Sequence, residues 1–299
     1  MKKINFNNSL ETFLIFDIIL VLLFLFFLIL TIVFYFITWP LFLLFLIGDL
    51  LFIYAVFIEP MFLRVKRYKI DLNDKYSRSL KIVFLSDFHV GGKFSRLVFS
   101  KIIQKVKSLK ANMIILGGDY VVWRKKEVEK LEFLKALEAD YGKYFVLGNH
   151  DYLDDPEFVV QKISEFGYKN IDNKCLELVF EGKKLNLCGV DDVDSGFPSI
   201  DYDLLTQKLK ILVTHNPDEL LNLKDGDFDV VMAGHTHNLQ INLPFLDRFF
   251  LPNKIKQRLR FGLKKIGRTF FVVSGGLGEV GIRARLFTPP EITFITINF

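Results

Sequence analysis

The sequence is poor in several residue types that would point to particular classes of protein. Its only cysteines are Cys175 and Cys188, which excludes a scaffold held by many disulfides and fits a reducing compartment better, although one bridge between them stays open. The net charge is only +5, so charge alone gives no reason to expect nucleic-acid binding. The chain after residue 78 shows no internal repeat and no low-complexity linker, and we expect one large domain there.

Charged residues are also scarce between Phe13 and Ile58, where nearly every residue is apolar. One crossing of a bilayer needs only about 20 residues, so this run is long enough for two helices. Trp39-Pro40 is the natural break between them, because proline ends a helix and tryptophan suits the membrane interface. The sequence predicts a transmembrane hairpin of residues 13–37 and 41–58 within an anchor of residues 1–69. A cleavable signal peptide is disfavoured, because a small-residue cleavage site and twin arginines are both missing.

Basic residues flank both ends of the predicted hairpin and are missing from its turn. Before the hairpin these residues are Lys2 and Lys3, and after it they are Arg64, Lys66, Arg67 and Lys69. By the positive-inside rule, this pattern predicts a multi-pass protein of the cell (inner) membrane with its large domain on the cytoplasmic side. Asp17 and Asp49 lie within the apolar run. Such carboxylates can serve in transport or proton relay, but an anchor with tolerated polar groups is the favoured interpretation.

In the domain predicted at residues 78–299, short apolar runs alternate with stretches of helical periodicity. This pattern predicts an α/β fold in which two sheets pack face to face with helices outside. Polar clusters follow several of the strands, at the sheet edge where α/β proteins bind ligands. The predicted strands are residues 80–85, 113–116, 144–147, 176–180, 184–188, 211–213, 230–232, 269–274 and 292–297, and the predicted helices are residues 94–109, 127–139 and 156–166.

The polar clusters together offer carboxylate oxygen, amide oxygen and imidazole nitrogen. The candidate ligands are Asp87, His89, Asp119, Asn149, His215, His235 and His237. This mixed set suits Mn, Fe or Zn, with Mn favoured, rather than Ca. Seven ligands exceed the need of one ion, and two divalent ions that share one carboxylate would use them all. Such a pair activates water for attack on phosphorus, so we expect hydrolysis of a phosphoester.

These clusters also carry a family resemblance. Asp87-Phe88-His89, Gly118-Asp119, Gly148-Asn149-His150-Asp151, His215 and Gly234-His235-Thr236-His237 resemble, in order and spacing, the motifs of the calcineurin-like metallophosphoesterase superfamily. The resemblance covers essentially the whole large domain and implies a four-layer β-sandwich flanked by helices. Further segments around Gly189, Gln240, Gly275 and Pro289 are similar to the membrane-associated branch of bacterial phosphodiesterases.

The resemblance also implies roles for individual residues. Asp87, His89 and His237 would hold the first ion, Asn149, His215 and His235 the second, and Asp119 would bridge them. His150 would be the catalytic residue that protonates the leaving oxygen or donates a hydrogen bond to the phosphoryl group. One position departs from the family pattern, since Val122 stands where many relatives have an aspartate that orients this histidine.

The substrate is less well defined by the sequence. Basic and aromatic residues alternate between Arg248 and Arg268, including Lys254, Lys256, Arg258, Arg260, Lys264 and Lys265. This stretch fits either a surface that binds anionic lipid headgroups or an ordinary solvated surface packed on the domain; nucleic acid is disfavoured by the anchor.

Three functions stay open at this point. The first is hydrolysis of a lipid-linked phosphodiester or pyrophosphate at the bilayer, for which the resemblance suggests UDP-2,3-diacylglucosamine in lipid A synthesis. The second is a phosphodiesterase or phosphatase for a soluble substrate, with the anchor only setting location. The third is a metal-binding membrane scaffold without activity.

Overall fold

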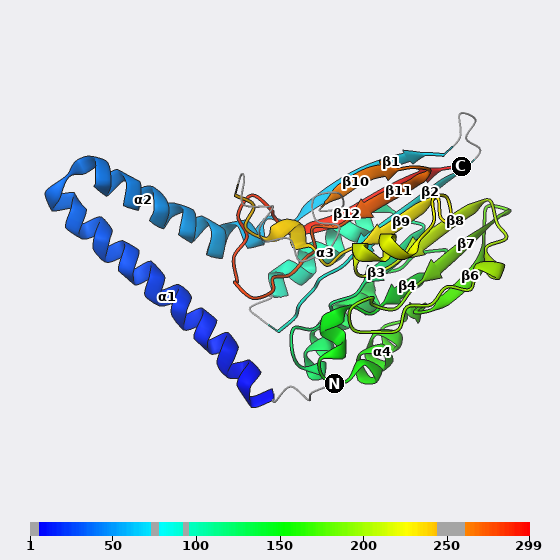
Figure 1. Ribbon diagram of the computed structural model, residues 1–299, viewed down its shortest axis with the longest axis horizontal. Coiled ribbons are helices and arrows are strands. Elements are labelled where there is room, and N and C mark those ends of the chain that lie inside the picture. The colour runs from blue at the N-terminus through cyan, green and yellow to red at the C-terminus, as the bar shows by residue number, and fades with distance from the viewer. Residues whose placement is uncertain (1–5, 73–77, 92–95, 244–260) are drawn as a thin grey trace.

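The computed structural model describes residues 6–72, 78–91, 96–243 and 261–299. Two long helices, α1 (Phe6–Ile37) and α2 (Trp39–Ile53), form a V that projects from the rest of the molecule (Figure 1). Thr38 separates them, and Pro40 lies in the first turn of α2, where its missing N–H is not needed. The predicted N-terminal hairpin is therefore confirmed, with its break where proline placed it.

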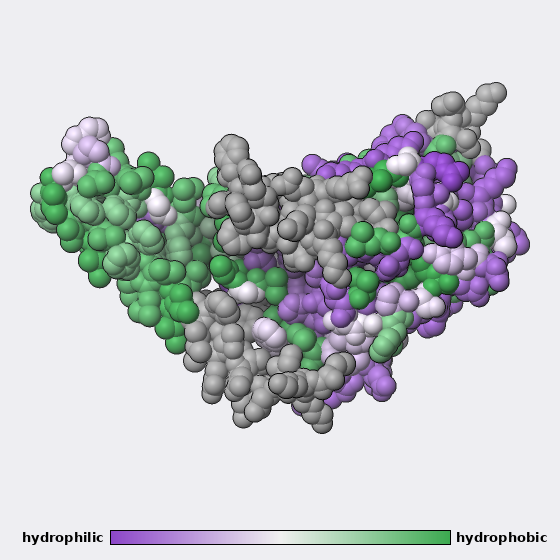
Figure 2. All heavy atoms as spheres, in the orientation of Figure 1, coloured by the Kyte–Doolittle hydropathy of each residue, from purple (hydrophilic) through white to green (hydrophobic). Residues whose placement is uncertain are grey.

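The surface of this hairpin is almost entirely apolar (Figure 2). Its segments Asp17–Ile37 and Trp39–Met61 are long and apolar enough to cross a membrane, and only 6% and 11% of their most apolar windows are buried. A short π-helical turn, η1 (Tyr54–Ile58), and a 3₁₀ turn, η2 (Glu59–Met61), continue α2 toward the domain. Unburied helices of this composition fit a membrane anchor better than a soluble core.

The first sheet has six strands in the order β1-β12-β2-β3-β4-β5. Strands β2 to β5 run parallel, as do β1 and β12, whereas β12 and β2 are antiparallel. The near-continuous apolar runs of β2 and β3 are typical of strands covered on both faces. The bounds are β1 (Arg64–Asp71), β2 (Ser79–Leu85), β3 (Met113–Gly117), β4 (Lys143–Val146), β5 (Lys169–Asn170) and β12 (Glu291–Asn298).

The second sheet also has six strands, in the order β10-β11-β9-β8-β7-β6. Strands β7, β8, β9 and β11 are parallel, and the two edge strands are antiparallel to their neighbours. The predicted hairpin around Gly182 is confirmed as β6 and β7. The bounds are β6 (Lys174–Phe180), β7 (Lys183–Gly189), β8 (Leu209–Val213), β9 (Val230–Ala233), β10 (Gly262–Ile266) and β11 (Thr269–Val273).

The two sheets bury one apolar core between their inner faces, with Phe84, Ile115, Leu187 and Val230 among its fully buried members. A second core lies on the outer face of the first sheet, where α3 (Arg96–Leu109) and α4 (Pro156–Glu165) pack. The outer face of the second sheet is covered by a smaller cluster and by the short 3₁₀ turns η5 (Tyr202–Leu204) and η6 (Pro217–Asn222). The predicted layered sandwich flanked by helices is confirmed.

One predicted α-helix has a different geometry. Residues Lys125–Ala136 form a 3₁₀ helix, η3, where the sequence predicted an α-helix over residues 127–139. The fully buried side chains Val128, Leu131 and Leu134 recur at every third position. Because a 3₁₀ helix has three residues per turn, this spacing places all of them on one face, toward the core.

The two cysteines are another correction. Cys175 and Cys188 face each other across the antiparallel β6-β7 pair and are joined in a disulfide. The sequence favoured a reducing compartment but left this one bridge open, because two cysteines alone do not reveal whether they are paired across neighbouring strands. The short glycine turn at Gly182 sets the register that brings them together.

Two segments near the edges of the sheets differ from their sequence-based interpretation. The basic segment after the hairpin, interpreted as a flank of the anchor, forms β1 and joins the first sheet beside β12. The C-terminal part of the basic-aromatic stretch, Gly262–Ile266, is the edge strand β10. Most of that stretch lies outside the described residues.

Candidate metal centre

The candidate ligands lie in the loops that leave the carboxyl ends of five strands from both sheets. Asp87 and His89 follow β2, Asp119 follows β3, Asn149 follows β4, His215 follows β8, and His235 and His237 follow β9. Parallel strands bring these ends to one edge of the sandwich. Five of the ligands have φ between 45° and 68°, namely Asp87, His89, Asp119, His235 and His237. Non-glycine residues rarely adopt such values outside functional sites, where the surrounding structure holds them.

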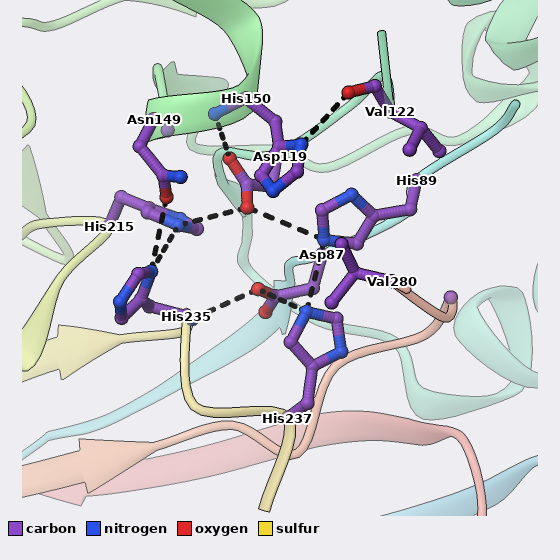
Figure 3. Close-up of polar contacts among 12 residues, drawn as sticks. Asp87, His89, Asp119, Val122, Asn149, His150, His215, His235, His237 and Val280 are labelled. Carbon is purple, nitrogen blue, oxygen red and sulfur yellow. Dashed lines mark hydrogen bonds and ion pairs between the residues drawn. The ribbon is translucent and has the colours of Figure 1, made fainter. Parts of the chain in front are cut away.

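The first group of ligands consists of Asp87, His89 and His237, all buried. The Nε2 atoms of His89 and His237 are 3.0 Å apart, and His237 Nε2 lies 3.4 Å from Asp87 Oδ1. Figure 3 shows the two rings and the carboxylate pointing toward one another. Their potential ligand atoms all lie within 4.8 Å of one another, so these residues could hold one ion.

The second group consists of Asn149, His215 and His235. His235 Nδ1 lies 3.1 Å from Asn149 Oδ1 and 3.3 Å from His215 Nε2. The other nitrogen of His215, Nδ1, is 2.8 Å from the carbonyl oxygen of Gly117. That contact leaves Nε2 to face the site, as is usual for a metal-binding histidine whose second nitrogen is held by the backbone.

Asp119 lies between the two groups (Figure 3). Its Oδ2 is 3.4 Å from His89 Nε2 and 3.2 Å from His215 Nε2, whereas its Oδ1 accepts the backbone N–H of His150 at 2.9 Å. One carboxylate oxygen is therefore shared by both groups. This is the position predicted for a bridging ligand.

Asp151 fixes the loop that carries Asp119 relative to the loop that carries Asn149. Its two carboxylate oxygens accept the backbone N–H groups of Asp119, Tyr120 and Gly148, each at 2.9 Å. The carboxylate is 1% exposed, so these bonds are protected from competition with water. The sequence analysis gave this residue no role, although its place directly after His150 was a signal that could have suggested one.

His150 is oriented by a backbone group. Its Nδ1 lies 2.8 Å from the carbonyl oxygen of Val122, to which it can donate. The residue that departs from the family pattern therefore still supplies an acceptor, through its main chain rather than its side chain. Backbone bonding of this kind cannot be recognised from residue types, which is why the sequence left the orientation of His150 open.

Three of the candidate histidine ligands are held neutral, whereas the Asp119 carboxylate, acting against burial, raises the pKa of His215 well above its usual value. Burial is the main cause that lowers the pKa of His89 to about 3 and that of His235 to about 4. Burial and the neighbouring His89 also lower the pKa of His237 well below its usual value. Neutral imidazoles at pH 7 have a free lone pair, which is the form that binds a metal ion.

Several polar atoms in the site point to a missing charge. Asp87 Oδ2 is buried and has no hydrogen-bond partner among the described residues, and the Nε2 atoms of His89 and His237 face each other in the site. Leaving a buried carboxylate oxygen unpaired is costly, and two facing ring nitrogens 3.0 Å apart gain little from each other. A carboxylate oxygen and two imidazole nitrogens are suitable donors to a divalent cation, so the residues fit the predicted metal centre.

The site opens into a cavity of about 380 Å³. Ligand residues and His150 line its inner part, and Leu239, Gln240 and Val280 line the rest. The sequence did not identify Val280 as part of the site, because it lies far along the chain in an irregular segment. This volume admits a phosphoester group together with part of the molecule that carries it.

Comparisons with known proteins agree with this geometry. Residues 80–239 match the model of the calcineurin-like phosphoesterase family. The chain is 32% identical over 238 residues to an uncharacterized metallophosphoesterase of Helicobacter pylori strain J99, covering 75% of this chain and 61% of that protein. It is 28% identical over 258 residues to the uncharacterized metallophosphoesterase YkuE of Bacillus subtilis, covering 82% of this chain and 89% of that one.

A further relative is the phosphodiesterase YaeI of Escherichia coli, 25% identical over 261 residues, with 82% of this chain and 92% of that protein covered. The chain spans about three-fifths of the length of the Helicobacter relative. The family model covers more than half of this chain and contains all the candidate ligands. The chain therefore belongs to the calcineurin-like phosphoesterase family.

Proposed function

We propose that this protein is a metal-dependent phosphoesterase that hydrolyses a phosphodiester or pyrophosphate bond. The observation that carries the proposal is the position of Asp119, whose one carboxylate oxygen faces His89 of one ligand group and His215 of the other. Two divalent ions, with Mn favoured, would be held by Asp87, His89 and His237 on one side and by Asn149, His215 and His235 on the other. When bound, such ions supply Lewis-acid stabilisation of the phosphoryl oxygens and a more acidic water.

His150 has the arrangement expected of the proton donor. Because its Nδ1 is bonded to the Val122 carbonyl, its Nε2 is the nitrogen available to the substrate. His150 also lines the cavity beside Asp119. A protonated Nε2 there would donate to the leaving oxygen as the bond to phosphorus breaks.

The substrate that we propose is carried by a lipid. The apolar hairpin would hold the domain at a bilayer, on the cytoplasmic side according to the basic flanks, and the cavity would then lie close to the lipid headgroups. UDP-2,3-diacylglucosamine, a precursor of lipid A, is the specific candidate. A soluble phosphoester with the hairpin acting only as a tether is the alternative, and a scaffold without activity is the third.

The test of catalysis is hydrolysis of bis-p-nitrophenyl phosphate by the full-length protein in detergent with Mn. Asp119→Asn should lower turnover by at least about 1,000-fold, because the charge shared by both ligand groups is lost. Asp201→Asn, on an exposed residue that does not line the cavity, is the matched control and should retain full activity. If the wild type, loaded with Mn, cleaves neither this ester nor any nucleotide diphosphate-linked lipid, the catalytic proposal is wrong.

The substrate class needs a second measurement. Rates on UDP-2,3-diacylglucosamine should greatly exceed those on its deacylated form, and they should depend on dispersal of the lipid in detergent. Equal rates on both forms would favour the soluble substrate. Association with membrane proteins that survives Asp119→Asn, without hydrolysis by the wild type, would favour the scaffold.

A further inference from the structure

One irregular loop, residues 280–288, joins the cavity to the hairpin. At its start, Val280 lines the cavity beside Gln240. The Gln240 amide donates to the carbonyl oxygens of Val280 and Ile282 at 3.0 and 2.9 Å, and its oxygen accepts the Val280 N–H at 2.6 Å. The loop therefore cannot move at this end without changing the wall of the cavity.

The other end of the loop is bonded to the hairpin. The N–H of Arg285 donates to the carbonyl oxygen of Ala55 at 2.9 Å. The buried carboxylate of Glu59 accepts the N–H of Phe287 at 2.8 Å and that of Thr288. On the other helix, Asp17 forms an ion pair with Arg283 at 3.3 Å. Both arms of the hairpin thus contact the same short loop.

These contacts fix the depth of the loop relative to the apolar segments. Ala55 lies six residues before Met61, the last residue of the apolar segment Trp39–Met61. At about 1.5 Å per helical residue, the contact at Ala55 is about 9 Å inside the end of the segment. That is the depth at which interfacial side chains meet the acyl chains.

The side chains that the loop presents to its surroundings are apolar. Ile282 is 45% exposed and Phe287 is 57% exposed. Phe287 also has a φ of 61°, which is unfavourable for an aromatic residue. The Glu59 carboxylate holds it there, so the structure maintains an exposed ring in a strained conformation. Strain of this kind is typical of functional positions.

The polar groups of the loop are turned inward. The fully buried guanidinium of Arg285 donates to the carbonyl oxygens of Gly275, Gly276 and Thr288. Backbone groups that would be costly in an apolar environment are thereby satisfied within the protein. The loop consequently combines an internally bonded backbone with outward apolar side chains, as expected of a segment in contact with lipid.

We propose that the 280–288 loop is immersed in the bilayer interface, with Ile282 and Phe287 against acyl chains, and that the cavity receives its phosphoester from this side. The second half of this inference rests on the proposed catalysis; the first half rests only on the proposed position of the hairpin in a bilayer. The partner of the surface is the lipid bilayer itself. Contact with a second copy of the chain is the competing outcome that the experiments distinguish.

Immersion is tested by fluorescence quenching in nanodiscs of phosphatidylcholine and phosphatidylglycerol. Phe287→Cys is labelled with an environment-sensitive dye without reductant, since the native cysteines are in a disulfide. Val179→Cys is the matched control, because Val179 is 55% exposed and lies beside the Gly182 turn, at the end of the sheets away from the site. Lipids with a nitroxide on the acyl chain should quench the dye at position 287 strongly and the dye at 179 hardly at all.

Two results would overturn this part of the proposal. Equal quenching at both positions would show that the loop is not immersed. Protection of the dye at 287 that depends on protein concentration and not on the nitroxide lipid would show that a second copy covers the surface.

Delivery of the substrate is tested with two p-nitrophenyl phosphodiesters, of which only the one with a long alkyl chain partitions into lipid, and each variant is compared with the wild type on the same ester. On dodecyl p-nitrophenyl phosphate in vesicles, Phe287→Ser should lower kcat/KM about tenfold, the effect expected for losing one aromatic side chain from an apolar environment. On soluble bis-p-nitrophenyl phosphate it should change nothing. Phe287→Leu should restore the vesicle activity, and Val179→Ser should match the wild type on both.

The outcomes separate the two proposals. Equal loss on both esters would mean that Phe287 only maintains the structure of the site, which would overturn delivery through the loop. Cleavage of neither ester by the wild type would reject the proposed function, whereas the quenching experiment would still decide whether the loop is immersed.

Discussion

His150 acts in this site through a contact that its own residue type does not reveal. The carbonyl of Val122 accepts from its Nδ1, and the ring also lies against His89 with centroids 4.8 Å apart. The first contact selects the tautomer with a free Nε2, and the second places the ring beside the first ligand group. The Val122 carbonyl and the His89 ring take the place of the aspartate that the resemblance led us to expect at position 122.

The role of His150 can be tested by changing the leaving group. His150→Gln should lower kcat about 100- to 1,000-fold on an ester with an alkyl leaving group, which needs a proton. On a p-nitrophenyl ester the loss should be much smaller, because p-nitrophenolate leaves without protonation. Val122→Ala should leave kcat close to that of the wild type, since the hydrogen bond to His150 uses the main-chain carbonyl of residue 122. A loss that is the same for both leaving groups would contradict a role as proton donor.

Gly148 shows how tightly the loops of the site are packed. A Cβ added there would lie 2.3 Å from Asp119 Oδ1 and 2.8 Å from His215 Cγ. Gly148→Ala must therefore displace Asp119 or the Asn149 loop. We expect a loss of about 1–3 kcal/mol in the free energy of unfolding, as for other overpacked sites, together with loss of one bound Mn per chain.

Metal content by mass spectrometry and thermal unfolding check this prediction. Gly182→Asn is the control, because nothing lies within 4 Å of a Cβ at that turn and asparagine tolerates its φ of 81°. Full metal content in Gly148→Ala would mean that Asp119 does not bind the ions in the way proposed.

Among the secondary-structure elements, the central strands and the candidate site could be predicted together, because the candidate ligands directly follow the strands in the sequence. Apolar runs such as that of β2 mark buried parallel strands, and polar residues directly after them mark the functional edge. The five histidines were recognisable because each follows such a run. The ligands Asp87, Asp119 and His235 therefore lie where strand ends were predicted.

Other elements could not be predicted in the same way. Strand β1 alternates basic and apolar residues, which reads equally well as a flank of the hairpin, and its partner β12 is 227 residues away. The pairing is stabilised by Arg64 and Glu291, an ion pair at 3.2 Å whose carboxylate is buried. Long-range partners of this kind leave no local periodicity in the sequence, and the contact of the loop with Glu59 is another example.

The disulfide between β6 and β7 belongs to this level as well. Cys175 and Cys188 are 13 residues apart, so the bridge closes a short loop and should add about 3 kcal/mol to stability. Cys175→Ser/Cys188→Ser should lower the free energy of unfolding by that amount and retain activity, since the cysteines do not line the cavity.

Alkylation of the unfolded protein, with and without reductant, checks the bridge directly. Mass spectrometry should find no alkylated cysteine before reduction and two after it. Two free thiols in freshly lysed, acid-quenched cells would instead show that the pair is reduced in the cell.

For the whole molecule, the arrangement of hairpin and domain predicts one topology in the membrane. The domain contacts Asp17 in the N-terminal half of α1 and Glu59 near the end of the second apolar segment. Both outer ends of the hairpin must therefore lie on the side of the domain, with the turn at Thr38 on the opposite side (Figure 1). If the two segments are transmembrane, these contacts require the chain to cross the bilayer twice, because a single crossing would leave only one end of the hairpin on the side of the domain.

Which side carries the domain depends on two features that point in different directions. The basic residues at both ends of the hairpin favour the cytoplasm, and a disulfide is more common outside it. We give the basic residues more weight, because flanking charges act while the helices insert, whereas neighbouring thiols can also oxidise after the cell is opened.

Labelling of intact cells with a membrane-impermeant maleimide tests this topology in the Cys175→Ser/Cys188→Ser background. Phe36→Cys, at an 80% exposed position next to the turn, should react without permeabilisation. Val179→Cys, at a 55% exposed position in the domain, should react only after the cells are permeabilised. The reverse pattern would place the domain outside the cytoplasm. The native disulfide would then be expected in the cell, and the substrate would have to be one that the outer leaflet presents, because the immersed loop lies on whichever side the domain occupies.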